Sequence, residues 1–365
     1  MTKRRDVIMA ERLHELKQTT STVQLRGVIT GTKSNRFYKS GTGKNGGAWN
    51  AIEMGVKIAE NETVYVKLNG FPRPEVFYYK KGEGKAKGDT QKVAWKNRHK
   101  SPGEGYRLIG VNISTGKDEN GKNINKSFTE YDAVEWIHEN IHDGDSVLIR
   151  GSLEFSSYTD KNGQTRRKVD IVPNQISYTN EPIDLDDPNC NTMAEFENVI
   201  VFSSIDKEED ENGKATGRFV LSGYSIGYNT VEPVSFIIDA EHAKVANAIK
   251  KKMRPGNAIK TYGRVVIKNN IETVVEEDPW GSTETSPFER VVGPTIREYV
   301  VYKVDGSTFD TETYSEDAIA QALRKIKAAK TAKENFGEKP SAAVSDDADD
   351  WGSDDDDSLD DEAPW

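Results

Sequence analysis

Hydrophobic and polar residues alternate most clearly between Gly144 and Ile176. Every second residue from Val147 to Phe155 is apolar or glycine, and this period of two is typical of a β-strand with one buried face. Apolar residues within 169–172 begin a returning strand. Between the two, Asn162-Gly163 supplies the positive backbone φ angles that a tight turn needs. The stretch is therefore predicted to be a β-hairpin.

The same reading predicts a small barrel between residues 22 and 180. Residues 23–32, 49–58 and 63–68 have strand patterns. Residues 131–142 have a helical pattern, because Tyr131, Val134, Ile137 and Ile141 share one helical face. The order strand, strand, strand, helix, strand, strand fits the OB-fold, a five-stranded Greek-key barrel.

A similar order returns after residue 195. Strand patterns lie at 195–205, 218–227, 231–240, 259–270 and 297–304, with a helix at 241–253 and a break at 276–294. The predicted fold class is therefore all-β dominated: tandem OB-folds, each with a short helix, plus a C-terminal helix and a disordered acidic tail. The expected organisation is an N-terminal arm (1–21, helical over 1–19), an OB-fold domain (22–180), a linker (181–194), a second OB-like domain (195–310), a helix (315–336) and a tail (341–365).

Composition and charge refine this organisation. The chain of 365 residues has 35% hydrophobic and 30% charged residues, and its single cysteine, Cys190, excludes a disulfide framework. Residues 1–180 hold 30 Lys and Arg against 21 Asp and Glu, residues 181–340 hold 20 against 28, and residues 341–365 hold none against 11. Such segregation favours nucleic acid at the basic end. No signal peptide or membrane span is recognisable, so we expect a soluble cytoplasmic protein.

The segment 69–107 interrupts the first predicted barrel. It holds ten Lys and Arg, four acidic residues and several aromatic rings, and strand-like residues 107–114 follow it. Aromatic rings interleaved with cations favour base stacking plus phosphate contact. The polar centre, residues 80–89, is expected to be mobile. We expect about half of the rings to anchor the insertion to the domain rather than to bind a ligand.

Two motifs suggest other chemistry. The glycine-rich loop 41–47 is not a P-loop, because Asn45 follows Lys44 where Ser or Thr is needed. His138-Glu139-Asn140-Ile141-His142 satisfies the His-Glu-x-x-His pattern of zinc hydrolases. Asp143-Gly144 ends the helix directly after it and no third ligand is evident downstream, so a zinc hydrolase is kept only as a minor alternative.

Two blocks of the chain carry a family resemblance. They are the run from Val23 (VQLRGVITGTKSNRFYKSGTGKNGGAWNAIEM) and, above all, VEWIHENIHDGDSVLIRGSLEFSSYTDKNGQTRR. They resemble the bacterial single-stranded DNA-binding protein family, in which a Val-x-Ile/Val-x-Gly-x-Leu strand precedes a Tyr/Trp-Thr-Asp-Lys-x-Gly-x-x-Arg hairpin. The matching residues are Asp145, Val147, Ile149, Gly151, Leu153, Tyr158, Thr159, Asp160, Lys161, Gly163 and Arg166. That family lacks the insertion 69–107.

The acidic tail adds to the resemblance. It cannot bury enough apolar surface to fold, and it ends in Pro364-Trp365 after Asp360, Asp361 and Glu362. It resembles the acidic tip of bacterial and phage single-stranded DNA-binding proteins, with Trp365 in place of the terminal Phe. The resemblance implies that the tip recruits replication and recombination proteins such as a polymerase, a helicase or primase, or a nuclease. The polyanion is also expected to compete with DNA for the basic groove.

The predicted function is therefore sequence-independent single-stranded DNA binding in replication, recombination and repair, by a non-enzymatic protein encoded by a bacteriophage. No cofactor or metal is expected, and a homodimer or other homo-oligomer is. An RNA-binding OB protein and a strand-annealing recombination mediator stay open as alternatives. The predicted DNA-binding cations are Arg26, Lys33, Arg36, Lys44, Arg150, Arg166, Arg167 and Lys168, and the predicted stacking rings are Phe37, Tyr38, Trp49, Phe77, Tyr78, Tyr79, Trp95 and Tyr158.

Overall fold

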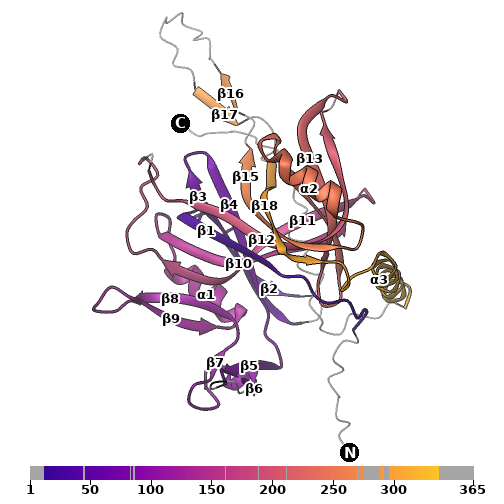
Figure 1. Ribbon diagram of the computed structural model, residues 1–365. Coiled ribbons are helices and arrows are strands. Elements are labelled where there is room, and N and C mark those ends of the chain that lie inside the picture. The colour runs from indigo at the N-terminus through magenta and orange to yellow at the C-terminus, as the bar shows by residue number, and fades with distance from the viewer. Residues whose placement is uncertain are drawn as a thin grey trace, which may run out of the picture.

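Strands dominate the protein, as the ribbon of the computed structural model shows (Figure 1). The structure describes residues 12–43, 46–82, 84, 87–160, 162–187, 189–210, 212–268, 271–274, 288–291 and 296–336. The elements before residue 180 are β1 (Ser21–Thr30), β2 (Tyr38–Thr42), β3 (Ala48–Ala59), β4 (Glu62–Gly70), β5 (Glu75–Lys80), β6 (Asp89–Ala94), β7 (Arg107–Leu108), β8 (Val111–Lys117), β9 (Asn123–Phe128), α1 (Glu130–Asn140), β10 (Ser146–Thr159) and β11 (Thr165–Tyr178). A short 3-10 helix, η1 (Trp95–Asn97), follows β6.

Five of the seven strands that the structure describes after residue 180 form a closed ring. The elements of this half are β12 (Met193–Glu209), β13 (Ala215–Ile226), β14 (Val231–Ile238), η2 (Ala240–His242), α2 (Ala243–Lys252), β15 (Ala258–Lys268), β16 (Ile271–Val274), β17 (Phe288–Val291), β18 (Ile296–Asp310) and α3 (Glu316–Phe336). Hydrogen bonds join β12 to β13, β13 to β14, β14 to β18 in parallel, β18 to β15 and β15 back to β12. In the chain, α2 lies between β14 and β15, the third and fourth strands of this ring. The arrangement is OB-like.

The N-terminal half has the same strand order with one opening. β1 pairs with β3 and β10, β3 pairs with β4, and β10 pairs with β11. β4 and β11 are in contact at the place where the ring would close, while β11 pairs in parallel with β8. The buried faces are apolar at every second position, including Val64, Val66 and Leu68 on β4. The expected all-β, OB-like fold class is confirmed.

The two halves share one continuous sheet. β1 pairs with β12 in antiparallel register, from Ser21 opposite Asn198 to Arg26 opposite Met193. The same β1 pairs with β10 on its other side, so hydrogen bonds run without interruption from β15 through β12 and β1 to β10. The apolar core also continues across the junction, where the Phe155 and Phe236 rings lie 6.2 Å apart.

Two expectations need correction. A helix over residues 1–19 is wrong for the described residues 12–19, which run without a helix beside the end of β13: the Thr19 N–H donates to the Ile226 carbonyl, and Leu16 is buried against α3. The insertion 69–107, which interrupts the barrel as expected, contains a separate three-stranded sheet of β5, β6 and β7. The strand expected at 107–114 is two strands in two sheets, β7 and β8.

No helix in the described part of the chain is long and apolar enough to cross a membrane.

Candidate nucleic-acid interface

Helix α1 organises the surface on which two of the predicted rings, Tyr38 and Trp95, lie. The Thr129 hydroxyl caps the helix by accepting a hydrogen bond from the Asp132 N–H at 3.1 Å. Asn50 on β3 donates to the Tyr131 carbonyl at 3.0 Å, so the first turn lies against the barrel. This close approach requires Gly70, since a Cβ atom there would lie 2.5 Å from the Tyr131 Cα atom.

Four rings follow α1 from the small sheet to the β2–β3 hairpin. Trp95 meets Tyr131 edge to face at 6.2 Å, and Tyr38 stacks on His138 at 4.0 Å between ring centres. Burial raises the pKa of Tyr131, and the neighbouring Glu135 raises it further. We call Trp95, Tyr131, Tyr38 and His138 the α1 aromatic belt. Such a row of π-faces suits the stacking of successive bases.

The small sheet is fixed to α1 by one charged pair. The Arg98 guanidinium donates to Asp132 through Nη2 to Oδ1 at 2.9 Å and through Nε to Oδ2 at 2.9 Å, and it lies over the Trp95 ring at 4.4 Å. Burial alone would raise the pKa of Asp132, but hydrogen bonds from Arg98 and Thr129 hold it below its usual value. Trp95 is therefore partly an anchor of the insertion.

The small sheet also presents rings to solvent. Phe77 and Tyr79 are 40% and 43% exposed on the same face of β5, and Ile109 beside them is 56% exposed. Lys92, opposite Phe77 on β6, lies 5.6 Å above the Phe77 ring. Cations beside exposed rings are the combination expected at a base-stacking surface.

Two predicted rings are buried and need correction. Phe37 is 3% exposed and belongs to the barrel core, where His138 covers it at 5.9 Å. Tyr78 is 5% exposed, because it lies on the face of β5 opposite to Phe77, and its hydroxyl donates to the Arg98 carbonyl at 2.6 Å. Neither ring is open to a base. A pattern that counts aromatic residues cannot distinguish the two faces of such a short strand.

The outer wall of β3 and β4 adds a ring that the sequence-based list omitted. Tyr65 is 49% exposed between the buried Val64 and Val66, and it faces Gly55, which has no side chain. Lys57 is half-buried on the same wall. The alternation of residues 63–68 predicts that Tyr65 faces outward, although no cluster of rings and cations marks it.

The β10–β11 hairpin has the predicted turn and an unexpected neighbour. Asp160 Oδ1 accepts from the Asn162 and Gln164 N–H groups at 3.0 and 2.8 Å, Gly163 has φ of 75°, and Arg166 pairs with Asp160 Oδ2 at 2.9 Å. The Gln164 N–H, and then Arg166, lower the pKa of Asp160. The Ser157 hydroxyl donates to Glu232 of β14 at 2.6 Å. The hairpin therefore contacts the C-terminal half.

The hairpin cations differ in their surroundings. Arg167 is exposed, whereas Lys168 pairs with Asp170 at 3.2 Å near the buried Lys67 of β4. Burial, and then the neighbouring Lys168, lower the pKa of Lys67 to about 8, although Asp170 opposes this shift. Lys168 thus belongs to the junction of β4 and β11, and Arg167 is the more available phosphate ligand.

The remaining predicted residues are spread over the N-terminal half. Lys33 and Arg36 are exposed in the loop after β1, Tyr158 and Trp49 are half-buried, and Lys44 lies outside the described residues. Arg26 and Arg150 lie on the β1–β10 wall, where Arg26 is opposite Leu148 and Arg150 is opposite Gln24. The tail residues Asp360, Asp361, Glu362, Pro364 and Trp365 also lie outside the described residues.

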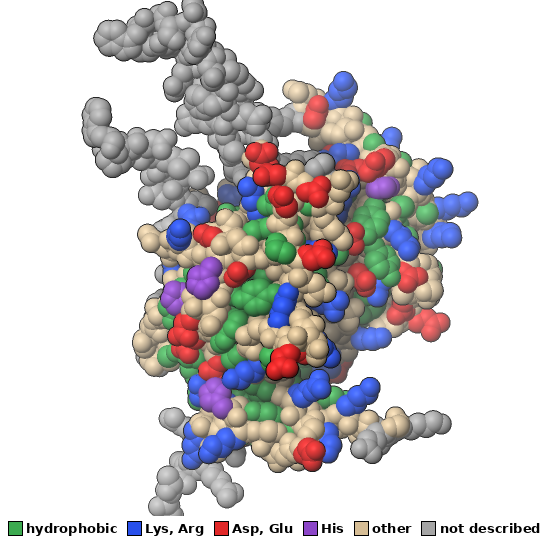
Figure 2. Space-filling model, turned by 90° about the vertical axis from the view of Figure 1, so that its left-hand side faces the viewer, with side chains coloured by type: hydrophobic (Ala, Val, Ile, Leu, Met, Phe, Trp, Pro, Cys, Tyr) green, Lys and Arg blue, Asp and Glu red, His purple; other side chains and the backbone are tan. Residues whose placement is uncertain are grey.

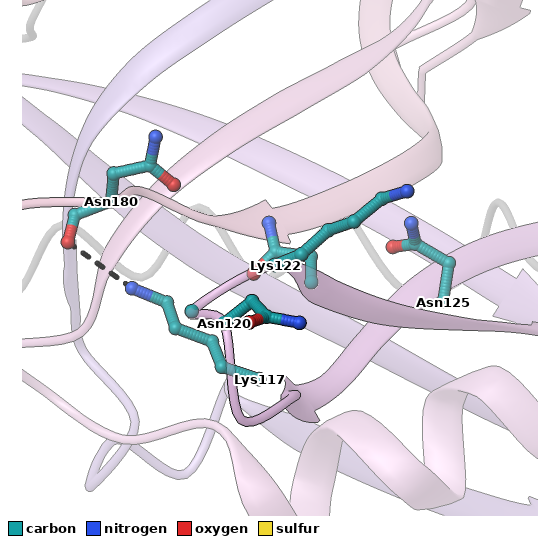
Figure 3. Close-up of a pocket in the computed structure, with 7 residues that line it drawn as sticks. Lys117, Asn120, Lys122, Asn125 and Asn180 are labelled. Carbon is teal, nitrogen blue, oxygen red and sulfur yellow. Dashed lines mark hydrogen bonds between the residues drawn. The ribbon is translucent and has the colours of Figure 1, made fainter.

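The side of the molecule with α1 and the β8–β9 hairpin is shown in Figure 2, where hydrophobic side chains gather in the middle with charged side chains of both signs around them. A polar hollow of about 640 Å³ lies at the β8–β9 turn, lined by Lys117, Asn120, Gly121, Lys122, Asn123, Asn125 and Asn180 (Figure 3). Lys117 Nζ donates to the Thr179 and Asn180 carbonyls at 2.9 and 3.1 Å. The hollow offers ammonium and amide groups but no ring for base stacking.

The His-Glu-x-x-His pattern does not form a helical pair of ligands. α1 ends at Asn140, and Ile141 is already extended, with φ of −101° and ψ of 132°. His142 is therefore not one helical turn beyond His138, whose ring stacks on Tyr38 instead. Within the described ranges, no three His, Cys, Asp or Glu side chains are grouped to hold a metal ion.

The fold and the surface define a strand-dominated OB-like protein with a row of rings and cations beside one helix. The family model of YorF matches residues 80–339, and the chain belongs to the YorF family. A search of curated proteins found no matching sequence. Among solved structures, a deletion mutant of the single-stranded DNA binding protein from Thermus aquaticus matches with 10% identity and a TM-score of 0.37 over 79% of this chain and 94% of that chain. The wild-type Thermus aquaticus protein matches with 11% identity and a TM-score of 0.36 over 79% and 93%.

Proposed function

We propose that this protein binds single-stranded DNA without sequence preference, as a coating protein in replication, recombination and repair, and that it acts without catalysis. The α1 aromatic belt carries this proposal, and the small sheet docked at its end exposes two more rings, Phe77 and Tyr79. Rings that stack on bases and cations that contact phosphates are the two parts of such an interface.

In the proposed mechanism, the strand follows α1 and the outer wall of β4 toward the β10–β11 turn. Bases stack on Tyr38, Trp95, Tyr65 and the exposed rings of the small sheet, each contributing about 1–3 kcal/mol. Lys33, Arg36 and Arg167 contact phosphates. Since every base has a π-face, this arrangement selects single strands rather than a particular sequence.

The remaining parts of the proposal follow the sequence resemblance. Residues 22–180 form the binding domain, residues 195–310 form a second domain after a linker, and the tail recruits replication and recombination proteins. A bacteriophage origin, action in the host cytoplasm and a homodimer complete the proposal.

Binding of labelled oligo-dT and oligo-U of equal length, measured by fluorescence anisotropy at several salt concentrations, tests the proposed ligand. Tighter binding of oligo-dT supports the proposal, and tighter binding of oligo-U would make RNA the ligand. Rapid pairing of complementary strands in the presence of the protein would add a strand-annealing activity to the same interface.

A further inference from the structure

Two helices of the C-terminal half carry exposed cations that the proposed DNA path does not use. Lys250, Lys251, Lys252 and Arg254 lie at the end of α2, and Arg324, Lys325, Lys327 and Lys330 lie on α3. All eight are exposed. We call them the α2–α3 cationic surface. It stands out because residues 181–340 as a whole have an excess of eight acidic residues, 28 against 20.

The two helices are neighbours in space. Gly256, just after α2, would place a Cβ atom 3.1 Å from the backbone nitrogen of Glu316, the first residue of α3. α3 is held on the barrel by its apolar side, through Ile319 and Ala322 in a cluster that includes Leu16. Its basic residues are left toward solvent.

In the described part of the chain, none of the eight cations forms an ion pair with a carboxylate. Arg254 donates to the Lys251 and Met253 carbonyls at the end of α2, which complements that helix terminus but does not cancel its charge. The only acidic residues in the first turn of α3 are Glu316 and Asp317.

We propose that the α2–α3 cationic surface binds the acidic segment 341–365 of the same chain. This segment has 11 acidic residues and no Lys or Arg, and it begins five residues after the end of α3 at Phe336. The 29 residues that follow α3 can extend to about 100 Å, more than the length of about 30 Å of α3 itself. A short tether gives such a segment an effective concentration of about a millimolar or more at the surface beside it.

The other candidate site for the tail is the basic surface of the N-terminal half, where the charge of the tail leads us to expect competition with DNA. That surface combines its cations with exposed rings, as a ligand with bases requires. Two exposed rings of the C-terminal half, Tyr228 and Phe309, lie at strand ends near helices α2 and α3. The assignment of the tail therefore rests on charge, because eight exposed cations suit a carboxylate-rich peptide. A tail held there leaves the proposed DNA path open and keeps the segment beside the barrel until a partner takes it.

Zero-length carbodiimide cross-linking of the full chain, followed by peptide mass spectrometry, tests this inference. Links between tail carboxylates and Lys250–Lys252, Lys325, Lys327 or Lys330 are expected at about 0.01 M salt. They should be lost at about 1 M salt, where the Debye length falls from about 30 Å to about 3 Å. Mixed isotope-labelled and unlabelled chains separate links within one chain from links between two chains.

A charge-reversal variant, R324E/K325E/K327E/K330E, should abolish the links to α2 as well as those to α3. The matched control K207E/K214E changes two exposed lysines on the β12–β13 hairpin of the same half and should leave the links unchanged. Links that go mainly to Lys33 or other lysines of the N-terminal half, links only between chains, or no tail links at all would overturn the proposal. So would a loss of oligo-dT affinity on charge reversal in a chain that lacks 337–365, because the surface would then be a nucleic-acid site.

Discussion

Arg98 of the insertion and Asp132 of α1 form a bidentate salt bridge, in which the Nη2–Oδ1 and Nε–Oδ2 distances are both 2.9 Å. Arg98 follows the short helix after β6, and Asp132 is in the first turn of α1, so the pair joins the small sheet to the barrel. Their side chains are 21% and 11% exposed, which distinguishes the pair from an ordinary surface ion pair. The rings of the insertion are thereby held at the end of the α1 aromatic belt.

Replacing Arg98 with Ala should therefore destabilise the docking of the small sheet. Removing one partner of a largely buried pair leaves an uncompensated carboxylate, which costs about 3 kcal/mol. Hydrogen exchange should show faster exchange in β5 and β6 and little change in β12–β15. The control Lys92→Ala breaks the more exposed pair with Glu75 and should cost less than about 1 kcal/mol. Equal exchange in both variants would contradict the anchoring role.

The same contact predicts a pH dependence. The pKa of Asp132 is lowered in the folded protein, so its contribution to stability is present above the unfolded value of about 3.9 and is lost as the pH falls through the lower folded pKa. Acid should therefore release the small sheet in the native protein. In Asp132→Asn, the protection of the β5 and β6 amides, corrected for the intrinsic pH dependence of exchange, should no longer change with pH in this window.

Tyr65 tests the outer wall of β4. Tyr65→Ala should weaken oligo-dT binding about 5- to 150-fold, which corresponds to the 1–3 kcal/mol of one stacked base. Tyr65→Phe keeps the ring and should bind within about twofold of the unchanged protein. Because Tyr65 is 49% exposed, thermal unfolding should change little in either variant. An unchanged affinity of Tyr65→Ala would remove β4 from the DNA path.

Arg167 and Lys168 are adjacent in sequence and should behave differently. Arg167→Ala should reduce the steepness of log affinity against log salt by about 0.7, the value for one phosphate contact on a single strand. Lys168→Met should leave that slope unchanged, because Lys168 pairs with Asp170 at the junction of β4 and β11. A larger loss of slope in Lys168→Met than in Arg167→Ala would reverse the two assignments.

Lys67 is expected to destabilise the fold at neutral pH. Its pKa of about 8 is below the ordinary value of 10.5, so the unfolded chain binds more protons between these two values and stability should rise with pH from about 8 to about 10.5. Lys67→Met should increase the free energy of unfolding at pH 7 by up to about 3 kcal/mol. Denaturant unfolding at pH 7 and pH 10 checks this: the free energy of unfolding should rise with pH in the unchanged protein and should not rise in Lys67→Met.

The strand pattern and turn chemistry predicted much of this fold. The hairpin of β10 and β11, the helix α1 and the five main strands after residue 193 follow from local periodicity and from Asn-Gly turns, which are local properties of the chain. The pairing of β1 with β12 could not be predicted this way, because it joins strands about 170 residues apart through backbone groups that every residue has.

The candidate site was predictable by region and less so by residue. The segment 69–107 was selected by its rings and cations, but whether a ring is buried depends on which face of β5 meets α1. Tyr78 is buried for this reason, whereas Phe77 and Tyr79 are exposed, and Phe37, just before β2, is buried in the barrel core. The sequence pattern marks His138 only as a possible metal ligand, whereas in the structure its ring stacks on Tyr38.

Photo-cross-linking of oligo-dT that contains 5-iododeoxyuridine to the full chain tests the central claim most directly. The account predicts cross-links at Tyr38, Trp95, Tyr65 and one or both of Phe77 and Tyr79, with unlabelled oligo-dT competing for all of them. Cross-links confined to residues 193–310, or none above the level of a heat-unfolded control, would contradict a DNA path along α1 and β4.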